Sequence, residues 1–367
     1  MDSEAQLHWL ILSRLPGCSR AILRRLLDNS HNPVEILTLA DGAWCAAGAG
    51  SEVLRARRRW HAERAGGEVQ RAASADLELL ARKQGFLLPL GHPDYPVLLA
   101  EIPDPPPLLY GLGDRQALSR PQLAIVGSRR CASVSRRIAA EFAGALVQAG
   151  FSVVSGLALG VDAAAHAGAL DAGGPTVAVM ATGIDRCYPA RHKPLADRIQ
   201  KQGLLLSEFP PGTSPRPERF PMRNRIISGL SAGVLVVEAG LQSGSLITAR
   251  LALEQNREIF AVPHSIYFPG AEGCHHLLRQ GAVLATAVDD IIGEVASLCG
   301  VFAPPPVPAS DLSPLQALVY AELGFDPISV DQLVLSGVAD VAAVVAALSE
   351  LQMIGLLENR DGLYMRK

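Results

Sequence analysis

Four loops rich in glycine and serine contain residue types that suit phosphate binding. Each loop follows a short apolar run and precedes a predicted helix, so backbone N–H groups, serine hydroxyls and the positive helix end face the same space. The residues are Gly127 and Ser128, Ser155 and Gly156, Gly183, and Ser243, Gly244 and Ser245. A single loop of this kind is usually a tight turn, but four loops on one edge of a fold indicate an anion site.

Basic and aromatic residues accompany these loops. Arg129 and Arg130 follow the first loop, and residues 185–225 include nine basic and four acidic residues, a net charge of +5. Arginine matches the geometry of phosphate and stays charged, while the rings of Tyr188 and Phe220 could stack on bases. The pattern favours a groove for single-stranded nucleic acid. The alternative is a solvated helix face whose aromatic neighbours belong to the core.

Motifs for catalysis, cofactors and metals are incomplete. The chain has no G-x-G-x-x-G, no G-x-x-x-x-G-K-[ST], no G-x-S-x-G and no H-E-x-x-H pattern. Asp162 and His166 share one predicted helix, where we expect a local hydrogen bond that orders the turn rather than a general base. Cys274, His275 and His276 are adjacent, and adjacent side chains diverge on a helix or strand. We therefore expect no catalytic residue, no metal and no cofactor.

The apolar runs predict the element that brings the loops together. They are short and rich in β-branched residues, and helical patterns separate them, which is typical of βαβ units around a buried parallel sheet. The runs are residues 123–126, 152–154, 176–180, 204–206, 234–237 and 259–262. In a doubly wound sheet, ligands bind at the carboxyl ends of the strands, where these loops begin.

Length and composition indicate several domains. The chain has 367 residues, of which 49% are apolar, enough to bury a core. Five prolines in residues 303–314 predict an extended linker over residues 301–313. We therefore expect a helical module over residues 1–75, a Rossmann-like domain over residues 76–300 and a separate tail over residues 314–367.

The compartment follows from features that the chain lacks. No apolar run reaches the roughly 18 residues of a membrane span, and the acidic start differs from a signal peptide. The six cysteines are scattered and form no C-x-x-C pair, which favours reduced thiols. We expect a cytoplasmic protein without a membrane partner.

The two flanking regions differ in character. The segment Leu15 to Ser19 resembles half of a helix-hairpin-helix, with Ser19 in place of the second hairpin glycine, so an all-helical module of SAM or helix-hairpin-helix type is predicted. The tail predicts helices over residues 315–323, 330–335 and 340–351 and strands over residues 354–359 and 363–366. Three helices and a hairpin with a turn at Asp361 and Gly362 predict a winged helix.

The net charge of −3 argues against a uniformly basic nucleic-acid binder. This small net charge hides two opposite regions, because the net charge of −5 in residues 301–367 offsets the net charge of +5 in residues 185–225. The third helix of the tail contains no Lys or Arg, so we expect a protein-contact or regulatory role for the tail rather than duplex binding. Any nucleic acid would therefore bind in a defined groove of the central domain.

Longer motifs occur in one order along the central region and cover residues 86–295 almost continuously. They are GHPDYP (91–96), DPPPLLY (104–110), VGSR (126–129), SGLALGVD (155–162), GIDRCYP (183–189), SEFPPG (207–212), FPMRNRIIS (220–228), SGSLITA (243–249) and GCHH (273–276). In content and order they resemble the DNA-processing protein A family (DprA, also called Smf).

This resemblance implies an extended Rossmann-like domain that binds single-stranded DNA without catalysis. It also implies a homodimer that protects incoming strands and helps to load the RecA recombinase during natural transformation. Some members carry Lys directly after the Tyr-Pro pair, where this chain has Ala190 followed by Arg191 and Lys193. The DNA-binding residues would be Gly127, Ser128, Arg129, Ser155, Gly156, Arg191, Lys193, Phe220, Arg223, Asn224, Arg225, Ser243, Gly244 and Ser245.

A competing hypothesis is an enzyme of the nucleoside-monophosphate phosphoribohydrolase type, which has a similar Rossmann-like fold. Such enzymes need a Gly-Thr pair with a catalytic Glu close behind. Here Gly244 and Ser245 are followed by no acidic residue before Glu254. A transcription factor that works through the winged tail is a third interpretation, and the acidic tail argues against it.

Overall fold

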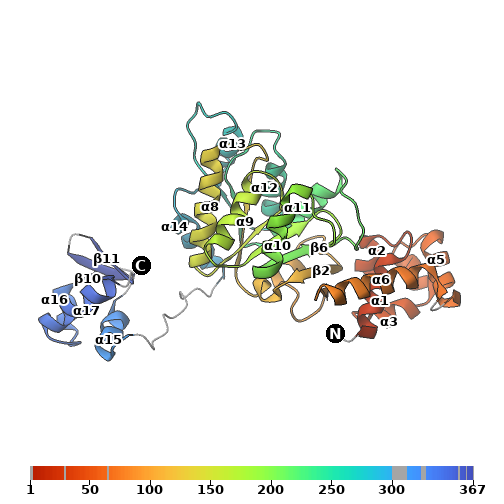
Figure 1. Cartoon of the computed structure of the whole chain (residues 1–367), viewed down its shortest axis with the longest axis horizontal. Coiled ribbons are helices and arrows are strands. Elements are labelled where there is room, and N and C mark those ends of the chain that lie inside the picture. The colour runs from red at the N-terminus through yellow and green to blue at the C-terminus, as the bar shows by residue number, and fades with distance from the viewer. Residues whose placement is uncertain are drawn as a thin grey trace. The chain divides into compact units, whose positions relative to one another are not determined.

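The computed structural model describes residues 3–28, 30–63, 66–299, 312–323, 328–353, 356–360 and 362–366. The chain divides into two compact units, residues 1–302 and 303–367, each of which is described by itself (Figure 1). The division falls within the predicted linker, most of which lies outside the described residues. In the described ranges, no helix is long and apolar enough to cross a membrane.

The described strands of the first unit form one nine-stranded sheet, in the order β1-β2-β6-β5-β4-β3-β7-β8-β9. Neighbours from β6 to β9 are parallel, whereas β1 pairs with β2, and β2 with β6, in antiparallel fashion. The strands are β1 (Phe86–Pro89), β2 (Leu108–Gly113), β3 (Gln122–Val126), β4 (Ser152–Ser155), β5 (Thr176–Met180), β6 (Leu204–Ser207), β7 (Gly233–Val236), β8 (Glu258–Ala261) and β9 (Val283–Leu284). The predicted Rossmann-like parallel sheet is confirmed, with β1 and β2 as an antiparallel extension.

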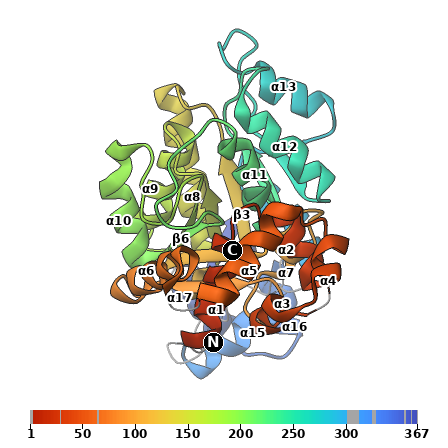
Figure 2. The same ribbon diagram turned by 90° about the vertical axis from the view of Figure 1, so that its right-hand side faces the viewer.

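Helices cover both faces of this sheet because both faces are apolar. Alternate residues of β3 point to opposite sides, so Leu123 packs in one core cluster and Ala124 in the other. Figure 2 shows α8, α9 and α10 on one side of β3 and α11, α12 and α13 on the other. The helices are α7 (Val97–Ala100), α8 (Ser133–Gln148), α9 (Val161–Asp171), α10 (Lys193–Gln202), α11 (Arg219–Leu230), α12 (Gly244–Glu254), α13 (Glu272–Arg279) and α14 (Val288–Cys299), with 3-10 turns η2 (Arg115–Leu118) and η3 (Ala190–His192).

The strand order reverses direction at β3. From β3 the chain winds outward through β4, β5 and β6, and it then returns to place β7 on the other side of β3. The loops after β3 and β7 therefore leave the sheet in opposite directions and open a crevice between them. Such a switch point is where doubly wound sheets bind their ligands.

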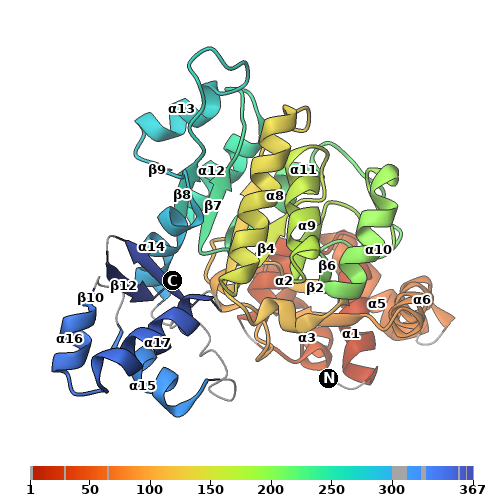
Figure 3. The same cartoon turned by 60° about the vertical axis from the view of Figure 1, so that its left-hand side comes forward.

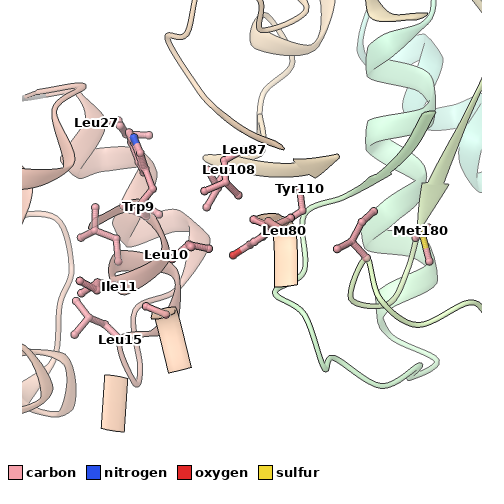
Figure 4. Close-up of a cluster of buried hydrophobic side chains, with 14 of the residues drawn as sticks. Trp9, Leu10, Ile11, Leu15, Leu27, Leu80, Leu87, Leu108, Tyr110 and Met180 are labelled. Atoms are coloured by element: carbon pink, nitrogen blue, oxygen red, sulfur yellow. The ribbon is translucent and has the colours of Figure 1, made fainter. Parts of the chain in front are cut away.

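The N-terminal helices pack against the β2–β6 side of the sheet. Their apolar faces share one core with residues of the sheet, and Figure 4 shows Trp9 and Leu10 of the module in the same cluster as Leu108 and Tyr110 of β2. Ser13 Oγ lies 2.9 Å from the hydroxyl of the fully buried Tyr110. The helices are α1 (Ser3–Arg14), α2 (Arg20–Leu27), α3 (Pro33–Thr38), α4 (Asp41–Ala46), α5 (Ser51–Glu63) and α6 (Glu68–Arg82).

The winged-helix fold predicted for the tail is confirmed in the second unit. Its three-stranded sheet has the order β10-β12-β11 and packs with α16 and α17 around Leu333, Val344 and Leu348 (Figure 3). The elements are α15 (Pro314–Glu322), β10 (Ile328–Ser329), α16 (Val330–Leu335), α17 (Val341–Met353), β11 (Leu357–Arg360) and β12 (Leu363–Arg366). The predicted turn residue Asp361 lies outside the described residues, and the short strand β10 was not predicted.

Close packing of α8 on α9 yields a prediction about stability. A Cβ at Gly168 of α9 would lie 2.3 Å from the carbonyl oxygen of Ala140 in α8, whereas a Cβ at Gly144 of α8 would lie 3.6 Å from its nearest neighbour. Alanine raises helix propensity at both positions. Gly144→Ala should therefore leave the free energy of unfolding unchanged or increase it, whereas Gly168→Ala should lower it by about 1–3 kcal/mol through overpacking. Urea midpoints of the two variants measure the difference, and equal midpoints would contradict the packing.

Candidate nucleic-acid interface

A pocket of about 810 Å³ opens at the switch point between β3 and β7. It is bounded by the loops after these strands, by the first turns of α11 and α12, and by Tyr188 of the loop after β5. The lining residues are Val126, Gly127, Ser128, Arg129, Arg130, Ala158, Asp162, Tyr188, Pro217, Phe220, Pro221, Arg223, Asn224, Ile227, Gly240, Gln242, Ser243, Gly244, Ser245, Ile247 and Thr248. The structure thus brings together most of the residues that the sequence singled out.

A buried guanidinium forms the floor of the pocket. Arg223 of α11 is only 4% exposed, and its Nη1 donates to the carbonyl oxygens of Gly156 and Val179, which follow β4 and end β5. Burial lowers the pKa of Arg223 to about 10, while the nearby Asp162 opposes this shift and Arg129 adds to it. The side chain therefore stays protonated at neutral pH and fixes a positive charge at the carboxyl edge of the sheet.

Asp162, at the first turn of α9, completes this floor. One of its carboxylate oxygens accepts hydrogen bonds from the backbone N–H groups of Gly156 (3.0 Å) and Ala158 (3.3 Å). Burial raises the pKa of Asp162, and the attraction of Arg223 and the two amides act in the opposite direction. The carboxylate thus holds the loop after β4 in place and is occupied by structural contacts.

His166, one turn further along α9, also binds the loop after β4. Its Nε2 accepts from the backbone N–H of Leu157 (3.3 Å), so Nδ1 carries the proton and lies 2.7 Å from Thr176 Oγ1. These bonds hold Leu157 in a left-handed conformation, with φ of 55°. Asp162 and His166 thus order the loop after β4, as predicted, and each does so through its own hydrogen bonds to the backbone.

Two aromatic rings and one guanidinium form one wall of the pocket. The guanidinium carbon of Arg129 lies 5.2 Å from the ring centre of Phe220, and the rings of Phe220 and Tyr188 are 5.6 Å apart. Arg129 is exposed and Tyr188 is 48% exposed. This wall therefore presents one free positive charge and open aromatic surface to a ligand, the combination that single-stranded nucleic acids require.

The opposite wall is the first turn of α12. Ser243 caps this helix, because its Oγ accepts from the backbone N–H of Ser245 and lies 2.7 Å from Ser245 Oγ. Asn224 connects this turn with the floor, since its side-chain oxygen accepts from Arg223 Nε at 3.2 Å and its amide group points to the carbonyl of Gly244. The hydroxyls and the positive end of the helix face the guanidinium groups across the pocket.

Two glycines let the loops approach one another. Gly160 has a φ of +78°, and a Cβ there would lie 2.2 Å from the carbonyl oxygen of Ser128. A Cβ at Gly127 would lie 2.6 Å from the side chain of Val161. Larger residues at either position would push the loop after β3 away from the start of α9 and change the shape of the pocket.

Arg225, which the sequence placed among the DNA-binding residues, does not line the pocket. It is 7% exposed and binds Glu208 through Nη2 (2.7 Å) and Asp104 through Nε (2.9 Å). Arg20 of the N-terminal module joins this network through Glu208 at 3.0 Å. On a helix, residues two positions apart lie about 200° apart, so Arg223 and Arg225 cannot face the same site.

The other predicted residues fall into two groups. Ser155 and Gly156 are buried behind the floor, where Ser155 Oγ donates to the carbonyl of Ile125 at 2.6 Å and Gly156 supports Arg223. Arg191 and Lys193 are exposed outside the pocket, and Lys193 pairs with Asp197 on the same helix. The first pair shapes the site without lining it, and the second pair lies beyond it.

Several lining residues were not among the predicted site residues. Arg130 and Tyr188 were visible in the sequence as neighbours of a glycine loop and of the basic segment. Gln242 and Thr248 were not, because one polar residue in a loop or a helix carries no signal by itself. Among the described residues, no group of His, Cys, Asp and Glu has the arrangement of a metal site.

Comparison with known proteins decides the family. A family model described as DNA recombination-mediator protein A matches residues 86–296, and one described as the DprA winged helix domain matches residues 303–362. The chain belongs to the DNA-processing protein A (DprA/Smf) family. Protein Smf from Synechocystis is 33% identical over 405 residues, which cover 100% of both chains.

Solved structures of the DprA family agree with this assignment. DNA processing protein A from Streptococcus pneumoniae gives a TM-score of 0.68 at 35% identity, over 78% of this chain and 96% of that one. A single-stranded DNA binding mode is described for DNA processing protein A from Helicobacter pylori. That structure gives a TM-score of 0.53 at 31% identity, over 58% of this chain and 96% of that one. The predicted membership in the DprA family is thus confirmed.

The buried state of His166 predicts a dependence of stability on pH. Burial lowers the pKa of His166 from 6.5 to about 3, so between these values the unfolded chain takes up a proton that the folded chain does not. The contribution of neutral His166 to the free energy of unfolding is complete above pH 6.5. It is lost as the pH falls below this value, by up to about 1.4 kcal/mol per pH unit. His166→Gln should flatten the fall of the urea midpoint between pH 6.5 and pH 4, measured against His31→Gln at an exposed position. An unchanged slope in His166→Gln would contradict the assignment.

Proposed function

We propose that this protein binds single-stranded DNA in the switch-point pocket, with little preference for sequence and without catalysis. The observation that carries the proposal is the cluster of Arg129, Phe220 and Tyr188, which lines the pocket together with the first turn of α12 and the buried charge of Arg223. The rings can stack on any base, and the guanidinium groups, hydroxyls and backbone amides can donate hydrogen bonds to phosphate oxygens. The single-stranded DNA binding mode described for the Helicobacter pylori relative supports this proposal.

The wider role follows from membership in a family of DNA-processing proteins. We propose that the protein works in the cytoplasm as a homodimer, protects incoming single strands during natural transformation and helps to load RecA. Within it, the central domain of residues 76–300 would bind DNA. The helical module of residues 1–75 would brace that domain, and the winged helix of residues 314–367 would contact protein partners.

The enzyme alternative gains no support from the site. Asp162 is the carboxylate residue among the lining residues, and its oxygen is held by two backbone amides beside Arg223. Glu254, the first acidic residue after the Gly244 loop, ends α12, the helix whose first residue lines the pocket. A nucleotide in the pocket would therefore meet positive charge and rings rather than a free acid or base.

A salt titration tests the proposed role of Arg129. Arg129→Ala should weaken binding of an oligothymidylate at least about tenfold, because a hydrogen bond to a charged group contributes about 1.5 kcal/mol or more. The plot of log affinity against log salt should lose a slope of about 0.7 for each phosphate contact removed. Fluorescence anisotropy at several salt concentrations gives both quantities.

The matched control for this titration is Arg198→Ala. Arg198 is also exposed and also within the basic segment, but it pairs with Asp171 outside the pocket. It should keep the affinity and slope of the parent protein. Equal losses in both variants would show that general surface charge, and not the pocket, binds the DNA.

Removal of the tail tests which unit binds the strand. The chain without residues 304–367 should retain its affinity for single-stranded DNA within about twofold, because the tail carries a net charge of −5 and phosphate is repelled by negative charge. Anisotropy with the same oligothymidylate measures this. A severalfold loss would show that the winged helix contributes to the DNA site.

A further inference from the structure

The loop between β8 and α13 exposes two large apolar side chains. Ile266 is 80% exposed and Tyr267 is 87% exposed, although both belong to residue types that usually find partners in a core. The proposed pocket does not include either of them. Both side chains are therefore accessible to a ligand at the carboxyl edge of the sheet.

This loop is held in place rather than frayed. The rings of His264 and Phe268 stack with centres 4.8 Å apart and planes 14° apart. His264 Nε2 lies 2.7 Å from the carbonyl of Val237, and the backbone N–H of Phe268 donates to the carbonyl of Ser265 at 2.9 Å. The base of the loop is thus fixed on both sides of Tyr267, so its ring is presented to solvent.

The loop adjoins the pocket through the residues that follow β7. The N–H of Gly273 donates to the carbonyl of Ala239 at 2.7 Å, and a Cβ at Gly270 would lie 3.3 Å from a carboxylate oxygen of Glu238. The main chain of Glu238 in turn accepts from the N–H of Ser128, a pocket residue. Figure 3 shows the loop before α13 rising from the sheet on the side of α12, whose first turn forms a wall of the pocket.

The chemistry of the loop differs from that of the pocket. Residues 263–271 contain no Asp, Glu, Lys or Arg, so the loop offers aromatic and apolar surface without charge. Arg130, which is exposed at the rim of the pocket, supplies positive charge at the same edge of the sheet. Positive charge for phosphates at the rim of the pocket and an uncharged ring for a base on the loop are thus both offered at this edge of the sheet.

We propose that Tyr267 is a second base-stacking platform, which extends the single-stranded DNA site beyond the pocket towards β8. This inference rests on the proposed function. Every base has a π-face, so the platform adds affinity without adding sequence preference. Because the ring is uncharged, it adds affinity for strands long enough to leave the pocket and does not change the number of phosphates neutralised.

The test compares Tyr267→Ala with the parent on oligothymidylates of about four to about twenty nucleotides. Short strands that fill only the pocket should bind both proteins equally. Long strands should bind Tyr267→Ala at least about fivefold more weakly, as expected for the loss of one base stack, with an unchanged salt slope. Tyr267→Phe should behave as the parent does, and Val97→Ala, at a 71% exposed apolar position on α7, should have no effect.

The outcomes separate this inference from the function on which it rests. If Tyr267→Ala binds every length as the parent does while Arg129→Ala is impaired, the platform is wrong and the pocket stands. If Tyr267→Ala changes the oligomeric state by light scattering, the loop docks a second copy and the inference is also overturned. If the parent binds no oligothymidylate, the proposed function itself has failed.

Discussion

The burial of the Arg223 guanidinium is the constraint on which the site depends. A buried charge needs compensating partners, and the carbonyls at the ends of β4 and β5 together with Asp162 supply them. These contacts connect α11 with two strands and with the start of α9. The glycine at 156 is part of the same arrangement, because a Cβ there would lie 2.5 Å from Arg223 Nη2. The pocket is therefore a consequence of how one positive charge is accommodated at the edge of the sheet.

The two arginines of α11 lie on opposite faces of the helix. Arg223 faces the pocket, and Arg225 faces the opposite side, where Glu208 and Asp104 neutralise it. Burial opposes ionisation of Asp104, but its attraction to Arg225, Arg20 and Arg24 outweighs this and lowers its pKa. The same network connects the N-terminal module with the sheet. It therefore also stabilises the position of α11, the helix that carries Arg223.

Sequence reasoning succeeded where local patterns carry the information. Runs of β-branched residues predicted the parallel strands, and Gly-Ser loops next to them predicted where a pocket would form, because both signals are read within a few residues. It failed for β1 and β2, because the prolines and glycines of residues 86–113 resemble irregular chain. Charge alone does not tell which face of a helix a residue occupies, so the sequence did not show that Arg225 lies away from the pocket. The exposure of Tyr267 is set by tertiary packing and has no sequence signal.

A defined pocket and general surface charge would distinguish single strands from duplexes differently, because the bases of a single strand are unpaired. The most direct measurement compares the affinity for one sequence as a single strand and as a duplex at two salt concentrations. Binding in the pocket should give tighter binding of the single strand at both salt concentrations, since a duplex offers no free base to Phe220 and Tyr188. Equal affinities that fall together with salt would contradict it, because only phosphate attraction would then remain.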